Sequence, residues 1–246
     1  MLDIRAVSRD FAGVKALDGV SFKVEDNSIT SLIGPNGAGK TTMINVISGV
    51  ISPSSGDVVF GGASIVSLRT NQRAAIGIRR TFQTVHLFSG LSVRENLTVG
   101  RFRNMLSGGW LHALLPESIG DRAGRRLADQ TLEFLGLDHH ADTVATELPY
   151  GTQRRVEIAR ALMGQPRFIL LDEPAAGMND AETDRLRDDI RRIRDSGITV
   201  FLVEHDMSLV MSVSDQVVVL DFGRKLAEGT PAEVQRNPEV IASYLA

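Results

Sequence analysis

The chain has 246 residues, of which 43% are hydrophobic, and a formal net charge of -3. This length and apolar content suffice for one α/β domain with a buried core, and the slightly acidic balance does not favour nucleic acid as a partner. The sequence contains no cysteine, which excludes disulfides, thiolate nucleophiles and cysteine-ligated zinc.

The N-terminal segment MLDIRAVSRDF mixes charged residues into the region where a signal peptide needs an apolar core, so we expect a cytoplasmic protein. Nowhere do about 18 consecutive apolar residues occur, so no segment is expected to span a bilayer as a helix. A role at a membrane would therefore depend on partner proteins.

The first strong pattern is a strand, a glycine-rich loop and a helix. Residues 29–33 (ITSLI) are short, apolar and β-branched, which predicts a buried strand, and TTMINVISGV after the loop predicts a helix. Between them, GPNGAGKT at 34–41 fits the phosphate-loop pattern G-x-x-x-x-G-K-[ST] in the strand-to-helix context that the pattern requires. An accidental glycine turn is a much weaker interpretation.

This loop has the chemistry of a nucleotide phosphate site. Its backbone N–H groups and the helix N-terminus can surround a β-phosphate, Lys40 can reach the β- and γ-phosphates, and the Thr41 hydroxyl can bind Mg²⁺. The predicted nucleotide-binding residues in the loop are Gly34, Pro35, Asn36, Gly37, Ala38, Gly39, Lys40, Thr41 and Thr42.

The middle of the chain is predicted to be helical. No strand pattern occurs between residues 87 and 164, and helical periodicity is present at 121–135 and 153–163. The segment 105–116 (MLSGGWLHALLP) carries the only tryptophan and is interpreted as local packing, with a partner-docking surface as the alternative.

Three further strands are predicted in the last third, at 168–171, 198–203 and 217–220, with a charged helix at 180–196. This alternation predicts a largely parallel sheet with flanking helices. We expect one unit over 1–246, with a core of about 1–86 and 165–246 and a helical subdomain of about 87–164.

The strand at 168–171 runs directly into two carboxylates, Asp172 and Glu173. Because successive side chains of a strand point in different directions, Asp172 can reach the Mg²⁺ shell while Glu173 faces the γ-phosphate and activates a water. Such a pair alone is more often a solvated strand end, but a phosphate loop upstream reverses that balance.

Two polar residues are candidates for sensing the γ-phosphate and metal. His205 follows the strand at 198–203, at the carboxyl edge where α/β proteins bind ligands. Gln83, within RRTFQ, precedes the helical region and can join the metal or water shell through its amide. The other histidines show no metal-ligand spacing and are interpreted as surface or packing residues: His86, His112, His139 and His140.

These motifs together resemble one family over the whole chain, the ATP-binding subunits of ATP-binding-cassette (ABC) transporters. The resemblance implies a P-loop NTPase fold with a RecA-like, mostly parallel sheet, an antiparallel β region and an inserted helical subdomain. It identifies 34–42 with the Walker A loop, Gln83 with the Q-loop and 168–173 with the Walker B strand and its catalytic glutamate. His205 corresponds to the switch histidine, and Phe11 to the aromatic residue that stacks on adenine, although a lone aromatic there is usually core.

The family's signature sequence, Leu-Ser-Gly-Gly-Gln, aligns with a divergent segment that opens a predicted helix. Its residues here are Leu148, Pro149, Tyr150, Gly151 and Thr152, followed by Gln153. In the family this helix start contacts ATP held by the opposite subunit. Pro149 supplies neither hydroxyl nor N–H, but proline near a helix start is sterically favourable, and Gly151 with the helix dipole can still hold a phosphate.

The resemblance extends to one branch of the family. Asn179 stands where the family commonly has aspartate, and the segments LPYG, DEPAAGMN and EGTPAEV to NPEVIASYL are similar to the G-type ATPase subunit of bacterial branched-chain amino-acid importers. The alternatives are ATPase subunits for urea uptake or lipopolysaccharide export, and a soluble ABC ATPase without a transporter. A nucleotide-binding regulator without turnover is disfavoured by Glu173 and His205.

The resemblance implies an ATPase that uses ATP and Mg²⁺ and works as a pair of nucleotide-binding subunits, either two copies or two related chains. The expected partners are transmembrane permease subunits and, indirectly, a solute-binding protein. We expect the chain on the cytoplasmic face of the inner membrane as a peripheral subunit.

Overall fold

The computed structural model describes residues 1–100 and 117–245, so the segment 105–116 lies outside the described residues. The chain forms two compact units. The first comprises Met1–Arg80, Arg167–Pro174 and Ile190–Ala246, and the second comprises Thr81–Pro166 and Ala175–Asp189. Each unit is described by itself.

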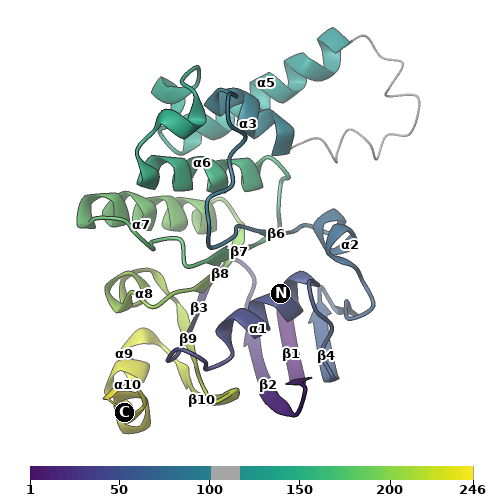
Figure 1. The fold of residues 1–246 in the computed structure, drawn as a ribbon, viewed down its shortest axis with the longest axis vertical. Coiled ribbons are helices and arrows are strands. Elements are labelled where there is room, and N and C mark those ends of the chain that lie inside the picture. Colours follow the sequence, from purple (N-terminus) through teal and green to yellow (C-terminus); the bar gives the residue numbers. More distant parts are fainter. Residues whose placement is uncertain (101–116, 246) are drawn as a thin grey trace. The chain divides into compact units, whose positions relative to one another are not determined.

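The first unit contains a six-stranded sheet with the order β10-β9-β3-β8-β7-β6 (Figure 1). Neighbouring strands from β9 to β6 are parallel, and β10 pairs antiparallel with β9. The strands are β3 (Ile29–Ile33), β6 (Ile78–Arg80), β7 (Phe168–Asp172), β8 (Thr199–Val203), β9 (Gln216–Asp221) and β10 (Arg224–Gly229). Residues of β3, β7 and β8 are all buried, as expected for central parallel strands.

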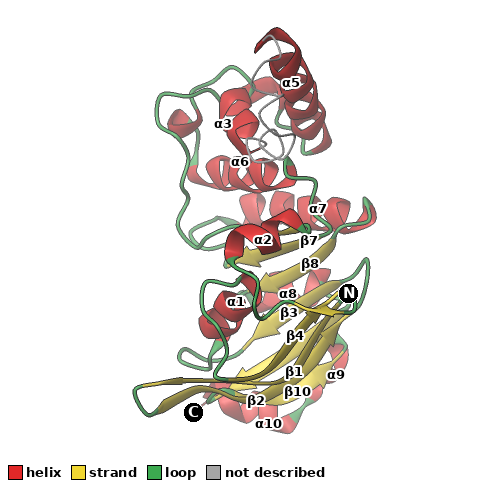
Figure 2. Ribbon diagram, turned by 90° about the vertical axis from the view of Figure 1, so that its right-hand side faces the viewer, coloured by secondary structure: helices red, strands yellow, loops and turns green. Residues whose placement is uncertain are grey.

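A second, antiparallel sheet of the first unit has the order β2-β1-β4-β5 (Figure 2). Its strands are β1 (Leu2–Phe11), β2 (Val14–Val24), β4 (Ser55–Phe60) and β5 (Ala63–Ser64). This sheet packs through its apolar face against α1 (Lys40–Ser48) and one face of the larger sheet, where Phe22 stacks on Phe201 at 5.8 Å.

The opposite face of the larger sheet is covered by the C-terminal helices. These are α8 (Met207–Val213), α9 (Pro231–Arg236) and α10 (Pro238–Leu245). Strand alternation divides the core between the two faces: Val218 and Leu220 pack with α1, whereas Val217 and Val219 pack with Val240 of α10.

A buried arginine holds the C-terminal end of α1. Arg73, in α2 (Thr70–Ala75), is 1% exposed and donates hydrogen bonds to the carbonyls of Val46, Ile47 and Leu68. Burial lowers the pKa of this guanidinium to about 10. A cation at a helix C-terminus is favourable because the last carbonyls carry partial negative charge. Arg73 therefore fixes the far end of the helix whose start follows the glycine-rich loop.

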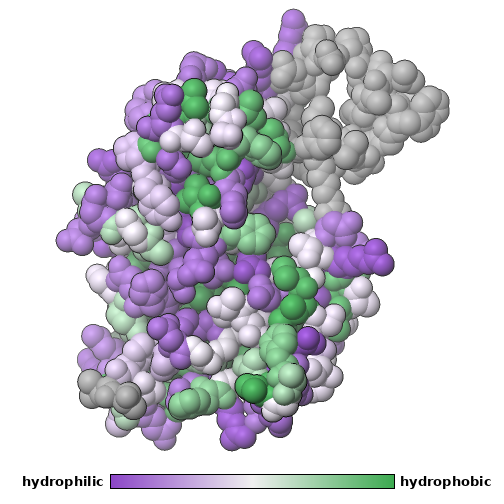
Figure 3. All heavy atoms as spheres, viewed as in Figure 1, coloured by the Kyte–Doolittle hydropathy of each residue, from purple (hydrophilic) through white to green (hydrophobic). Residues whose placement is uncertain are grey.

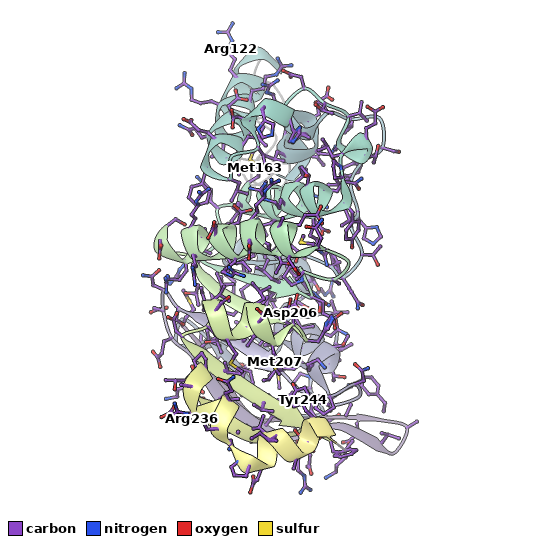
Figure 4. The ribbon with its side chains drawn as sticks, turned by 90° about the vertical axis from the view of Figure 1, so that its left-hand side faces the viewer. Arg122, Met163, Asp206, Met207, Arg236 and Tyr244 are labelled. Carbon is purple, nitrogen blue, oxygen red and sulfur yellow. The ribbon has the colours of Figure 1, made fainter. Side chains whose placement is uncertain are left out.

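The second unit is helical in the described part of the chain. Its elements are α3 (Val93–Gly100), α5 (Glu117–Phe134), the 3₁₀ turns η2 (Asp138–His140) and η3 (Ala145–Glu147), α6 (Tyr150–Leu162) and the start of α7 (Asp180–Asp195), which continues into the first unit. Helices α3, α5 and α6 pack together, and Figure 4 shows Met163 directly after α6 and Arg122 on α5.

These elements confirm the predicted mixed α/β architecture. The predicted strands at 29–33, 168–171, 198–203 and 217–220 correspond to β3, β7, β8 and β9, and the predicted helix at 180–196 corresponds to α7. Among the described residues, no helix is long and apolar enough to cross a membrane. The face in Figure 3 accordingly shows hydrophilic residues interspersed with smaller apolar clusters.

Candidate functional site

Three strand ends bring the sequence motifs of the first unit to one edge of the larger sheet. Leu32 of β3 pairs with Val203 of β8, and Val203 pairs with Asp172 of β7. Since all three strands are parallel, the residues that follow them emerge at the same edge. The glycine-rich loop, the Asp172–Glu173 pair and His205 therefore meet there.

The glycine-rich loop needs glycine where its backbone approaches other backbone. Gly34 has φ 151°, and a Cβ atom there would lie 2.1 Å from the carbonyl oxygen of Leu220. Gly39, the N-cap of α1, has φ 102°, and its Cβ would lie 2.5 Å from the carbonyl oxygen of Ala16. Any larger residue at either position would displace the main chain of the loop or its neighbour.

Lys40 is folded back over this loop. Its ammonium donates to the carbonyls of Gly34, at 2.7 Å, and Pro35, at 3.0 Å, and the residue is buried. Burial lowers the pKa of Lys40, and the negative charge of Glu173 partly offsets this. The loop therefore holds a buried cation within the electrostatic influence of the Glu173 carboxylate.

The loop also offers groups that an incoming ligand can reach. Asn36, Gly37 and Thr41 are exposed, Pro35 and Thr42 are half-buried, and Ala38 is buried. Gly37 has open space where a Cβ would be. Exposed backbone and the Thr41 hydroxyl next to Lys40 suit a phosphate chain with an associated cation.

Asp172 and Glu173 differ in their surroundings. Asp172 is buried, and its Oδ2 accepts a hydrogen bond of 2.8 Å from Arg80. Glu173 has φ 44°, unusual for a non-glycine residue, and its N–H donates to the carbonyl of Val203 at 2.8 Å. The Glu173 side chain is 21% exposed, so its carboxylate can contact water.

His205 lies beside this carboxylate. Its Nδ1 is 3.9 Å from Oε2 of Glu173 and 3.7 Å from Oε2 of Glu204, and the side chain is 61% exposed. The fully buried Glu204 accepts hydrogen bonds from the backbone N–H groups of His205 and Asp206. Asp206 in turn caps α8, and Figure 4 places Asp206 and Met207 at the start of that helix. Two carboxylates thus hold the backbone that carries His205.

Phe11 ends β1 opposite Val14 and is 42% exposed. The guanidinium of Arg9 lies over its ring, 4.6 Å from the centroid. The ring is therefore not a core residue, and it keeps apolar surface on which a planar group can stack.

Gln83 belongs to the second unit, where a buried arginine of α6 fixes its backbone. Arg154 donates to the carbonyls of Phe82 and Gln83, the latter at 2.8 Å, and forms an ion pair with Glu157 at 2.9 Å. Arg154 and Glu157 are 0% and 3% exposed. The Arg154 guanidinium therefore joins α6 to the segment that contains Phe82 and Gln83, here called the Gln83 segment.

The signature segment begins this same helix. Pro149 is the N-cap of α6, with no side-chain cap, and the Gln153 amide donates to the carbonyls of Thr146 and Leu148. Leu148 is buried, Tyr150 is exposed, and Thr152 and Gln153 are half-buried. The helix start forms without the serine cap of the family's signature.

Gly151 lies against the start of α7. A Cβ at this position would be 2.5 Å from the carboxyl group of Glu182. Glu182 and Asn179 cap α7 reciprocally: the Asn179 N–H donates to Glu182 at 3.1 Å, and the Glu182 N–H donates to the Asn179 amide oxygen at 3.0 Å. Asn179 therefore performs here the capping that an aspartate would also perform.

Three further residues at these motifs were missed by reasoning from the sequence. Arg80 contacts Asp172, Arg154 contacts the Gln83 segment, and the Tyr244 side chain in α10 hydrogen-bonds to the backbone of Gly34. Burial raises the pKa of Tyr244 to about 12, and the hydrogen bond to Gly34 opposes this rise. Arginine is frequent in this chain, so no sequence signal separated these two arginines from exposed ones.

The donor set near the loop suits a hard cation brought in by phosphates. Thr41 and Asp172 offer one hydroxyl and one carboxylate, and the described residues contain no group of three or more histidine, cysteine or acidic side chains that could hold a metal alone. Mg²⁺ typically keeps several waters and binds one or two protein oxygens together with substrate phosphates. The residues present therefore fit Mg²⁺ bound together with a nucleotide.

Comparison with known proteins gives the family. Residues 17–176 match the family model described as ABC transporter, and 224–245 match one described as branched-chain amino acid ATP-binding cassette transporter. The chain is 42% identical over 250 residues to the high-affinity branched-chain amino acid transport ATP-binding protein BraF of Pseudomonas aeruginosa, covering 100% of this chain and 97% of that protein.

A second curated protein and a solved structure support the same family. The corresponding Escherichia coli protein, LivG, is 41% identical over 249 residues, covering 100% of this chain and 97% of LivG. The crystal structure of an ATP-binding cassette in its ADP conformation superposes with a TM-score of 0.85 at 33% identity, covering 100% of this chain and 98% of the other. The chain therefore belongs to the ABC transporter family, as one of its ATP-binding, ATP-hydrolysing subunits.

Proposed function

We propose that this subunit binds Mg-ATP at the edge of the larger sheet and hydrolyses it to drive a branched-chain amino-acid importer. The observation that carries the catalytic part is the position of Glu173. Its charge acts on the buried Lys40 ammonium, and its carboxylate lies 3.9 Å from Nδ1 of His205. We infer that this carboxylate, which lies near a histidine and whose charge reaches the lysine of the phosphate loop, activates water for attack on a γ-phosphate.

The other residues of the first unit take complementary roles in this proposal. The loop Gly34–Thr42 wraps the phosphates with its N–H groups, Lys40 neutralises their charge, and Phe11 stacks on adenine. Thr41 and Asp172 would hold the Mg²⁺ ion. Gln83, which belongs to the second unit, is proposed as a further ligand of the metal through its amide. When bound, the metal neutralises charge that develops on the phosphate oxygens. His205 contacts the γ-phosphate.

The signature segment, residues 148–153, is proposed to contact ATP held by a second nucleotide-binding subunit. The start of α6 provides N–H groups and a positive dipole end for this. ATP between two subunits then supplies contacts that exist only in the closed pair, which is how a ligand biases a conformational equilibrium. Hydrolysis at Glu173 lets the two subunits separate.

The names of the relatives support the proposed cargo. BraF and LivG are named for high-affinity branched-chain amino acid transport, and the identity extends over the whole chain. We therefore propose that this subunit docks on transmembrane permease subunits at the cytoplasmic face of the inner membrane, with a solute-binding protein upstream.

The catalytic proposal is tested with Glu173→Gln protein. This change keeps the shape but removes the base, so phosphate release should fall by about 100-fold or more. With Mg-ATP, size-exclusion chromatography should show a closed dimer of the variant only. The matched control is Glu133→Gln, an exposed glutamate of α5, which should behave as wild type. Normal phosphate release by Glu173→Gln would contradict the assigned role.

The cargo is tested separately by uptake of radiolabelled leucine in cells that carry the subunit with its permease and binding protein. Uptake should require the wild-type subunit and should be lost with Glu173→Gln. If leucine, isoleucine and valine are not taken up while the purified subunit hydrolyses ATP, the ATPase assignment stands and the cargo proposal is wrong.

A further inference from the structure

A second buried ion pair lies directly beside the proposed metal site. Arg80, the last residue of β6, donates from Nη2 to Oδ2 of Asp172 at 2.8 Å, and the two side chains are 10% and 8% exposed. Its Nη1 donates to the Asn45 amide oxygen at 2.7 Å and to the Ser48 hydroxyl at 3.0 Å, both on α1. The guanidinium of Arg80 therefore joins the end of β7 to α1, the helix that follows the phosphate loop.

The sheet register explains how Arg80 reaches these groups. Arg80 pairs with Leu170 in the parallel ladder between β6 and β7. Paired residues point to the same face of a sheet, as do residues two apart along one strand, so Arg80, Leu170 and Asp172 share a face. Leu170 belongs to the core cluster that also contains Met43 and Ile47 of α1. Arg80 is thus fixed on the face that α1 covers.

The charge of Arg80 matters because this environment is largely desolvated. An ion pair in a region of reduced dielectric interacts more strongly than one in water, and removing one partner leaves an uncompensated buried charge. Asp172 is therefore balanced by a protein cation before any metal arrives. A divalent cation at Asp172 would gain less from the carboxylate than it would without Arg80, because Arg80 repels it.

We propose that Arg80 is a positioning residue that holds the Asp172 carboxylate and restrains the affinity of the site for the divalent cation, so that the cation binds together with nucleotide phosphates. This inference rests on the proposed role of Asp172 at the metal. Asp172 keeps its orientation while the cation is away, and the cation binds when the phosphates add the negative charge that outweighs Arg80.

A purely structural tie between β7 and α1 makes a different prediction. In that case, loss of Arg80 would lower thermal stability, but the dependence of nucleotide binding on Mg²⁺ would stay as in wild type. The discriminating quantity is the ratio of the ATP dissociation constant in excess EDTA to that in saturating Mg²⁺. This ratio reports the linkage between metal and nucleotide and cancels changes that affect both conditions equally.

The experiment uses the full chain with Glu173→Gln, so that ATP is not consumed, and a fluorescent ATP analogue as the probe. Arg80→Met removes the charge, and the ratio should rise about tenfold, since the unpaired Asp172 then repels free ATP and attracts Mg²⁺. Arg80→Lys keeps the charge but loses the forked contacts of the guanidinium, so its ratio should stay within about threefold of the parent and well below that of Arg80→Met. Asn45→Ala removes one α1 contact of Arg80 but not the ion pair, and it should leave the ratio unchanged.

Asp172→Asn separates this inference from the proposed function. The ratio should fall in Asp172→Asn, and Arg80→Met should add nothing in that background. If Asp172→Asn leaves the ratio as in the parent, the proposed metal role of Asp172 is wrong. If Asp172→Asn lowers it but Arg80→Met does not raise it, or if Arg80→Lys raises it equally, the inference about Arg80 is overturned while the metal role stands.

Discussion

The phosphate loop and the signature segment both lead into a helix start, but different physical constraints hold them. At the phosphate loop, Gly34 and Gly39 lie against carbonyl oxygens of other segments, so backbone crowding fixes the residue type. At the signature segment, Gly151 faces the end of the Glu182 side chain, which can move. The phosphate loop therefore tolerates few substitutions. The signature segment tolerates more, and it has Pro149 where the family's signature has serine.

Buried arginines extend the comparison beyond the two loops. Arg73 and Arg80 hold α1 from outside, through its C-terminal carbonyls and through Asn45 and Ser48. Arg154 lies on α6 itself and fixes the segment that carries Gln83. The loop before α1 is thus tightly constrained by its surroundings, while α6 orders the segment beside it.

The largest expected effect tests whether α6 orders the Gln83 segment. Arg154→Met removes the close ion-pair partner of the buried Glu157 and leaves only Arg160, at 3.9 Å. The free energy of unfolding should therefore fall by about 3–5 kcal/mol in urea titrations. Hydrogen exchange at residues 82–84 should accelerate. The double variant Arg154→Met/Glu157→Met should recover much of the stability but not the slow exchange. Unchanged exchange in Arg154→Met would show that the guanidinium does not order this segment.

The next effect contrasts the two glycines directly. Gly34→Ala combines backbone strain with a clash against the Leu220 carbonyl, so it should destabilise the chain by about 2–4 kcal/mol and abolish ATP binding. Gly151→Ala should change the unfolding free energy by less than about 1 kcal/mol, because alanine favours the helix and Glu182 can move. Thermal melts and ATP titrations of both variants check this. Equal destabilisation by Gly34→Ala and Gly151→Ala would show that the two glycines are under similar steric constraint, contrary to this prediction.

A smaller effect concerns the departure at residue 149. Pro149→Ser supplies a side-chain cap that α6 lacks, which should stabilise the chain by about 1 kcal/mol. If the signature segment contacts ATP across two subunits, the added hydroxyl should also strengthen Mg-ATP-dependent dimerisation in the Glu173→Gln background. Pro149→Ala is the matched control without a hydroxyl. Equal dimerisation of the serine and alanine variants would rule out a hydroxyl contact.

The smallest effect is a pH dependence at Lys40. Burial lowers the pKa of its ammonium below the ordinary lysine value of 10.5, so this cation is lost at a lower pH than that of an exposed lysine. ATP affinity should therefore weaken with rising pH before 10.5 is reached, and bound phosphate should shift this loss upward. The sign for stability is opposite: the buried ammonium is a cost at low pH that is relieved as pH rises through its lowered pKa.

ATP titrations across alkaline pH check the Lys40 prediction, with Lys40→Arg as the comparison, because a guanidinium stays charged over this range. The wild-type curve should fall where the Lys40→Arg curve stays flat. A flat wild-type curve up to 10.5 would show that the loop compensates the burial of Lys40.

The sequence predicted the central elements better than the edges. Strands β3, β7, β8 and β9 were expected because each is a short, largely apolar run, and burial on both faces favours that composition. Half of the residues of the edge strand β10 (RKLAEG) are exposed and charged and none is buried, and β5 has two residues, so neither has a recognisable pattern. The order of the strands in the sheet depends on how all of them pack together, so it cannot be predicted from the sequence of any single strand.

The same division applies to the candidate site. The sequence by itself determined the phosphate loop, the Asp172–Glu173 strand end and the position of His205, because local backbone requirements and strand alternation restrict the residues there. The tertiary structure alone decided that Arg80 neutralises Asp172, that Arg154 holds the Gln83 segment and that Tyr244 reaches Gly34. The two residues of each contact lie 92, 71 and 210 positions apart in the sequence, respectively. The packing of strands and helices determines which of these distant residues meet.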